Sequence, residues 1–181
     1  MKRNQCVFLA ALLLIGATTA GAQAALNLGL TATSPKVDGI VSANEYGVST
    51  TSQGLQVNLA WTADGLYVAV VGPTTGWVAA GLGSDAMDSA VLYIGFVTGD
   101  KVQFKVQKGS GHSHGDTTGF VPLQYAMKEA NGQTVLELVL KASDFIAKGQ
   151  KQLGLIAAAG GADSFLAMHR QKERILVALT Q

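Results

Sequence analysis

The chain has 181 residues, of which 48% are hydrophobic and only 14% are charged. Soluble domains carry about 25% charged residues, so this composition describes one compact, glycine-rich domain and excludes a disordered chain. The formal net charge is +1 and the lysines are scattered singly, so there is no basic surface of the kind that neutralises phosphates. Nucleic acid is therefore not expected as a partner.

The N-terminal residues have the three parts of a secretory signal peptide. Two basic residues precede an apolar stretch over residues 7–15, and small residues follow up to Ala24. The apolar stretch is too short to span a bilayer, so we expect cleavage after Ala24 and a location in the periplasm or outside the cell. This divides the chain into a signal peptide, residues 1–24, and a single domain, residues 25–181. The only cysteine, Cys6, leaves with the signal peptide, so no disulfide is expected.

Alternation of apolar and polar residues with a period of two is the dominant pattern in the rest of the chain. Residues 55–61 alternate in this way, and residues 66–71 return as a second strand after a tight turn, which predicts a β-hairpin. Asn131-Gly132 predicts the turn of a second hairpin, between residues 125–129 and 134–140. Residues 102–107 and 135–140 also alternate cleanly, so each of these two strands has one face suited to a core and one suited to water.

Other segments are apolar throughout, which is typical of central strands with both faces covered. They are residues 77–82, 90–97, 153–159 and, less strictly, 174–179. Helical periodicity is nearly absent, and Ser143 to Ile146 is expected to form a single helical turn with Ser143 as its cap. About ten short strands separated by turns predict an all-β fold, an antiparallel immunoglobulin-like β-sandwich.

One long irregular stretch, from Lys108 to Gly119, is predicted to be a loop, and it contains His112 and His114. Loops of this length are commonly functional or mobile. Two imidazoles at this spacing reach one metal ion only if the backbone bends or a further ligand joins them. The sequence leaves three interpretations open for this pair: a solvated loop, a metal site, and contact with a cofactor or partner.

The motifs of common enzyme classes are missing from the sequence. There is no Gly-x-Ser-x-Gly, no phosphate-binding glycine-rich loop that opens a helix, and no cysteine nucleophile in the domain. Asp85 and Asp88 lie three residues apart, but their glycine- and serine-rich surroundings are typical of a turn. We therefore expect a ligand-binding or electron-transfer domain without catalytic activity.

Several segments together resemble the DOMON domain family. The resemblance rests on Gly-Trp-Val-Ala-Ala-Gly-Leu-Gly at residues 76–83, on Met-Asp-Ser-Ala at 87–90, and on His169 near the end of the chain. The hairpin around residues 61–67 and the Leu-x-x-x-Asp-Phe segment at 140–145 follow the family's order. The resemblance covers nearly the whole domain and implies a β-sandwich.

Haem-carrying members of this family, such as the cytochrome domain of cellobiose dehydrogenase, hold a b-type haem between a methionine and a histidine. Carried over by position, the resemblance implies Met87 and His169 as the ligands of the haem iron, with Trp77 as a further cofactor-binding residue. Leu82 departs from the family pattern, in which an aromatic residue is common. Neighbouring side chains of a strand point to opposite faces, so Met168 is expected to face away from the site that His169 faces.

Ligation by a thioether and an imidazole suits iron and raises its reduction potential relative to harder ligand pairs. With both axial positions taken by the protein, such a centre moves electrons and has no open site for substrate. The sequence has no Cys-x-x-Cys-His, so haem b is expected to be held non-covalently. A periplasmic or membrane redox partner is implied.

A carbohydrate-binding β-sandwich without haem is the alternative function. The segment with Val-Asp-Gly at residues 37–39 looks like the opening of related sandwich modules that bind haem or sugars. Sugar recognition needs exposed aromatic faces beside hydrogen-bonding groups. The candidate side chains are Tyr46, Tyr67, Tyr93 and Tyr125.

Overall fold

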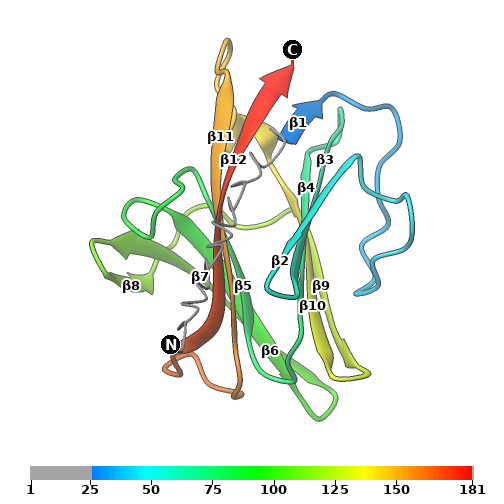
Figure 1. Ribbon diagram of the computed structural model, residues 1–181. Coiled ribbons are helices and arrows are strands. Elements are labelled where there is room, and N and C mark those ends of the chain that lie inside the picture. The colour runs from blue at the N-terminus through cyan, green and yellow to red at the C-terminus, as the bar shows by residue number, and fades with distance from the viewer. Residues whose placement is uncertain (1–25, 181) are drawn as a thin grey trace, which may run out of the picture.

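Two β-sheets packed face to face make up this protein, as Figure 1 shows for the computed structural model. The structure describes residues 26–180, so the predicted signal peptide, residues 1–24, lies outside the described residues. The described elements are β1 (Leu26–Gly29), β2 (Val48–Ser52), β3 (Leu55–Trp61), β4 (Leu66–Gly72), β5 (Val78–Leu82), β6 (Val91–Thr98), β7 (Lys101–Ser110), β8 (Ser113–Asp116), β9 (Gln124–Ala130), β10 (Gln133–Leu140), the 3-10 helix η1 (Ala142–Asp144), β11 (Gln152–Gly160) and β12 (His169–Thr180).

One sheet has seven strands in the order β1-β12-β11-β5-β6-β7-β8, and the other has five in the order β2-β3-β4-β10-β9. Neighbouring strands run antiparallel, except that β1 is parallel to β12. The predicted all-β sandwich is therefore confirmed. The three strands that the sequence did not reveal, β1, β2 and β8, are each the outermost strand of a sheet, where a short strand needs no apolar face.

The main core lies between the two sheets and is built from alternate residues of their strands. Leu59, Val68 and Leu138 of the five-stranded sheet are at most 1% exposed, and so are Tyr93 and Leu155 of the seven-stranded sheet. Aligned packing of two twisted sheets buries one face of each strand in this way. Burial of such apolar surface stabilises the fold by about 25 cal/mol per Å².

The two hairpins that the sequence predicts are present as β3–β4 and β9–β10. In the second, Asn131 and Gly132 have φ of 54° and 75°, the left-handed conformation that a two-residue hairpin turn requires. The apolar segments form β5, β6 and β11, which are adjacent in the middle of the seven-stranded sheet. Strand β12 is longer than predicted and begins at His169.

Two expectations from the sequence are wrong. Most of the predicted loop from Lys108 to Gly119 is a hairpin, because β7 continues to Ser110 and pairs with β8. The residues of β8 are all exposed, so this hairpin has no apolar face that the sequence pattern could have revealed. The single helical turn begins one residue earlier than expected and has Lys141 at its N-cap position without a side-chain hydrogen bond, so Ser143 lies inside the turn and does not cap it.

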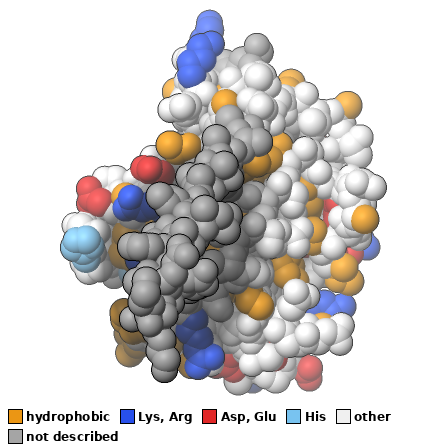
Figure 2. All heavy atoms as spheres, viewed as in Figure 1, with side chains coloured by type: hydrophobic (Ala, Val, Ile, Leu, Met, Phe, Trp, Pro, Cys, Tyr) orange, Lys and Arg blue, Asp and Glu red, His pale blue; other side chains and the backbone are white. Residues whose placement is uncertain are grey.

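A buried carboxylate fixes the loop that covers the outer face of the five-stranded sheet. Glu137 of β10 has no exposed surface, and its Oε2 accepts hydrogen bonds from the backbone N–H groups of Asp38 and Gly39 at 3.0 and 2.7 Å. Its Oε1 accepts a third from the Tyr46 hydroxyl at 2.7 Å. Burial of this carboxylate raises its pKa above the usual value. Elsewhere, the face visible in Figure 2 carries few charged side chains.

We expect Glu137→Leu to lower the free energy of unfolding by at least about 3 kcal/mol, because it leaves three buried donors without an acceptor. Glu137→Gln keeps a carbonyl oxygen for the two backbone donors and is expected to stay within about 1 kcal/mol of the wild type at neutral pH. Urea unfolding of both variants measures the difference. Equal losses in the two variants would contradict this role for the carboxylate.

The same carboxylate predicts a pH dependence of stability. Because the pKa of Glu137 is higher in the folded chain than its ordinary value of 4.5, the folded state holds this proton more tightly than the unfolded state. The contribution of Glu137 is therefore greatest below pH 4.5 and declines as the pH rises through the folded-state pKa. We expect the free energy of unfolding of the wild type, relative to Glu137→Gln, to fall between about pH 4 and pH 7. A relative stability that rises over this range would contradict the shift.

Candidate functional site on the outer face of the seven-stranded sheet

A cavity of about 390 Å³ lies on the face of the seven-stranded sheet that points away from the main core. Its floor consists of outward-facing residues of the three central strands: Ala79 and Gly81 of β5, Leu92 and Ile94 of β6, and Ile156 and Ala158 of β11. These strands are apolar on both faces because one face contributes to the core and the other to this cavity. This arrangement agrees with the prediction that the apolar segments are central strands with both faces covered.

Small residues make the floor hollow. Ala79 lies opposite Ala158 in the pairing of β5 with β11, and Gly81 lies opposite Ile156. A Cβ atom at Gly81 would lie 2.5 Å from Cγ1 of Ile156 and 2.7 Å from Cδ2 of Leu92. Gly81 therefore lets the larger side chains of its two neighbouring strands close in beneath the cavity.

Met87 lines the cavity from the loop between β5 and β6, and it is half-buried. This loop lies against β7, where the N–H of Ser89 donates to the carbonyl of Gly109 at 3.1 Å. The Asp88 carboxylate accepts a hydrogen bond from the N–H of Gly111 at 2.7 Å. A Cβ atom at Gly109 would overlap the carbonyl of Met87, so only glycine at position 109 allows this approach.

His169 lines the cavity from the first position of β12, on the far side of the floor in strand order. The pairing of β11 with β12 is regular up to Ala159, opposite Gln171, and then shifts so that Gly160 lies opposite His169. Without this bulge, Gly160 of β11 would lie opposite Arg170 of β12 in the strand pairing. Gly160 faces the cavity side, because a Cβ atom there would overlap the Trp77 indole. The bulge therefore turns the His169 imidazole to the side of the cavity, a common use of bulges near functional sites.

Trp77 closes one end of the cavity and supports the segment that leads to His169. The indole is 5% exposed, and its Nε1–H donates to the carbonyl of Ala167 at 3.1 Å. Phe165 of the same segment packs on Phe96 with ring centroids 4.8 Å apart. Trp77 is thus part of a second apolar cluster, separate from the main core, that borders the cavity.

The expectation that Met168 faces away from the site is wrong. Met168 also lines the cavity and is 81% exposed. Because β12 begins at His169, the alternation of a strand does not extend to Met168. The cavity therefore has two methionines on its border, of which Met87 is the more buried.

His112 and His114 reach the border of the same cavity from the β7–β8 hairpin, and both are exposed. Nδ1 of His114 donates to the amide oxygen of Gln107 at 2.7 Å, and the Gln107 amide nitrogen donates to Asp116 at 2.7 Å. That hydrogen bond, together with Lys105, holds the pKa of Asp116 below its usual range. Among the described residues, no group of three or more His, Cys, Asp or Glu side chains is arranged to hold a metal ion.

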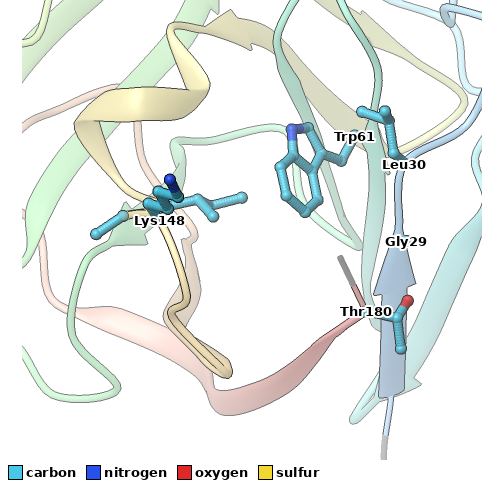
Figure 3. Close-up of a pocket in the computed structure, with 7 residues that line it drawn as sticks. Gly29, Leu30, Trp61, Lys148 and Thr180 are labelled. Carbon is cyan, nitrogen blue, oxygen red and sulfur yellow. The ribbon is translucent and has the colours of Figure 1, made fainter.

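A second cavity, of about 540 Å³, lies at the end of the sandwich. Figure 3 shows the Trp61 indole across this cavity from Lys148, with Leu30 and Thr180 on the side of β1 and β12. Trp61 packs against the main core, as its place in the alternating pattern predicts, and it is only partly buried because it also lines this cavity. The sequence gives no sign of this cavity, because residues far apart in the chain form it.

The tyrosines offer little aromatic surface for a sugar. Tyr67 and Tyr93 are 6% and 0% exposed, and the Tyr46 hydroxyl is bound to Glu137. Tyr125 is 44% exposed, but one face of its ring is stacked on Phe104 with centroids 4.1 Å apart. The four candidates thus lie apart from the cavity on the outer face of the seven-stranded sheet.

Solved structures of two kinds share this fold. The cytochrome b domain of pyranose dehydrogenase from Coprinopsis cinerea is 13% identical, with a TM-score of 0.54 over 72% of this chain and 80% of that one. The cytochrome domain of Myriococcum thermophilum cellobiose dehydrogenase is 12% identical, with a TM-score of 0.50 over 70% and 75%. A family 9 carbohydrate-binding module from Caldicellulosiruptor kristjanssonii, in complex with cellotriose, is 16% identical, with a TM-score of 0.52 over 85% and 93%.

At these identities the similarity shows a shared β-sandwich fold and leaves the ligand open. No protein-family model and no curated protein matches the sequence of this chain. In the described part of the chain, no helix has the length and hydrophobicity to cross a membrane.

We expect Trp77→Phe to loosen residues 161–168, because it removes the hydrogen bond to Ala167 and part of the wall on which this segment rests. A neutral hydrogen bond contributes about 1 kcal/mol, so amide hydrogen exchange in this segment should become about fivefold faster. Trp61→Phe, at the other cavity, is the matched control and should leave this exchange unchanged. Equal exchange in Trp77→Phe and the wild type would show that the indole does not support the segment.

Proposed function

We propose that this chain is a periplasmic b-type cytochrome domain that holds haem non-covalently between Met87 and His169 and transfers single electrons. One observation carries the proposal. Met87, His169 and Trp77 come from three separate segments of the sequence, and all three line one apolar cavity. The resemblance to the DOMON family implies the same three residues as the haem site.

The chemistry of the cavity fits a haem. The volume of about 390 Å³ is within the range of about 300–1,000 Å³ that is usual for cofactor sites. The floor of alanine, glycine and aliphatic side chains suits a flat apolar ring. The thioether of Met87 and the imidazole of His169 are a ligand pair used for haem iron in electron-transfer proteins.

When bound, the haem supplies a centre that accepts and donates one electron. The residues of the chain hold and tune that centre. The His169 imidazole and the Met87 thioether would hold the haem iron from the protein side, which would leave no open site for substrate and favour electron transfer over catalysis. The apolar floor keeps water away from the site, and the Trp77 cluster supports the segment from which His169 projects.

The expected signal peptide supports a location in the periplasm or outside the cell, and its removal leaves a domain that does not span a membrane. A single-electron carrier needs a donor and an acceptor. The partner is therefore a periplasmic or membrane redox protein, and nucleic acid plays no part.

A carbohydrate-binding function without haem is the second candidate, because the fold is shared over 93% of a family 9 module in complex with cellotriose. The cavity has polar groups at one border, including Gln107, Ser113 and His114. However, sugar recognition needs an exposed aromatic face beside such groups, and the Trp77 indole is buried against the segment before His169. The apolar floor therefore favours haem.

Absorption spectroscopy of the protein supplied with haem tests the proposal. We expect a low-spin b-type spectrum, its loss in His169→Ala, and a lower reduction potential in Met87→Ala or a coordination position open to carbon monoxide. Met168→Ala is the matched control for the thioether, and the double variant His112→Ala/His114→Ala is the control for the imidazole. Both controls should keep the wild-type spectrum.

Three results would overturn the proposal or change it. A colourless protein that takes up no added haem excludes the cytochrome function, and saturable sugar binding measured by calorimetry would then favour the second candidate. An unchanged low-spin spectrum in His169→Ala excludes that residue as a ligand. Loss of the spectrum in His112→Ala/His114→Ala alone would move the imidazole ligand to the β7–β8 hairpin.

A further inference from the structure

Three cations stand close together in β12, directly after His169: Arg170, Lys172 and Arg174. All three are exposed, and the two arginines are the only ones among the described residues. The ion pairs of the described residues are Lys36–Asp38 and Lys105–Asp116, so these three cations have no carboxylate partner there. Such a concentration is notable in a chain with only 14% charged residues.

The pairing of β12 with β11 places two of these cations beside the cavity. Lys172 lies opposite Ala158 and Arg174 lies opposite Ile156, and both partners belong to the cavity floor. Directly opposed residues of an antiparallel pair share one face of the sheet. Lys172 and Arg174 therefore project on the cavity side, one strand beyond its floor. Arg170 is the extra residue of the bulge, and its guanidinium lies over Gly161.

Acidic groups around the cavity do not neutralise the charges of Lys172 and Arg174. Glu173 lies opposite Ala157, whose side chain belongs to the main core, so it is on the other face of the sheet. Asp116 is bound to Gln107 and Lys105, and Asp88 is bound to the N–H of Gly111. The apolar cavity thus has a positive border along β12.

We propose that Lys172 and Arg174 form a carboxylate clamp that binds the two propionate groups of the haem. This inference rests on the proposed function and assigns the residues that hold the polar edge of the cofactor. Arginine suits the task because its planar guanidinium binds a carboxylate through two parallel hydrogen bonds, and lysine adds a compact charge. The apolar floor and the cationic strand together match a ligand that is hydrophobic over most of its area and anionic at one edge.

The opposing interpretation is that these charges only protect an edge. Strand β1 pairs with β12 at Val177 to Thr180, so the first half of β12 is an open edge of the sheet. Exposed lysines and arginines commonly discourage such edges from pairing with other chains. This interpretation predicts no dependence of haem affinity on the two residues, which makes the two ideas separable.

The test compares ferric haem with its dimethyl ester, which has the same ring and iron but no carboxylates. Titration of the protein followed by absorbance gives both affinities for the wild type and for Lys172→Gln/Arg174→Gln. We expect the double variant to bind haem at least about tenfold more weakly and to bind the ester as the wild type does. Lys141→Gln/Lys151→Gln removes the same charge from exposed sites outside the cavity and should bind both as the wild type does.

A second measurement uses the wild type alone. Added salt should weaken the binding of haem and leave the binding of the ester unaffected. The reason is that only haem has carboxylates for the exposed charges of Lys172 and Arg174 to hold. Equal haem affinity in Lys172→Gln/Arg174→Gln and the wild type, or equal salt dependence for haem and ester, would overturn the clamp while haem binding stands. A wild type that binds neither porphyrin would overturn the proposed function and the clamp with it.

Discussion

The central strands β5 and β6 of the seven-stranded sheet are buried on both faces, and the remaining features of the candidate site depend on this constraint. One face of β5, β6 and β11 packs into the main core, and the other forms the cavity floor. Strands covered on both sides must be apolar throughout, which explains why a chain with so little charge folds as a domain of this size. On the cavity face, Gly81 leaves room for the larger side chains of Ile156 and Leu92 on the two neighbouring strands.

Local backbone geometry brings the candidate ligands to this floor. Met87 approaches β7 only because position 109 is glycine, and His169 faces the cavity because β12 carries a bulge. Both devices lie at the ends of strands, where the ladder is interrupted and a side chain can be turned without disturbing the core. The rigid centre of the sheet therefore provides the surface, and its irregular ends provide the polar and coordinating groups.

This contrast between the regular centre of the sheet and its irregular ends decides how much of the structure the sequence alone could predict. The central strands and the β9–β10 hairpin were predictable because apolar runs and Asn131-Gly132 are local patterns. The β7–β8 hairpin was not, because all its residues from Ser113 to Asp116 are exposed and its pairing is held by the backbone. Likewise, the position of Met168 beside the cavity depends on the residue at which β12 begins, and no spacing in the sequence fixes that residue.

Cytochrome domains and a carbohydrate-binding module share this sandwich, so the fold does not distinguish their ligands. The distinction has to come from the outer face of the seven-stranded sheet. A sugar presents hydroxyl groups around its whole edge and needs polar partners throughout its site. Here the polar groups stand at the borders: Gln107, Ser113 and the two histidines of the β7–β8 hairpin on one side, and His169, Lys172 and Arg174 of β12 on the other. Between them the floor is apolar, which matches a ligand whose polarity is confined to its edge.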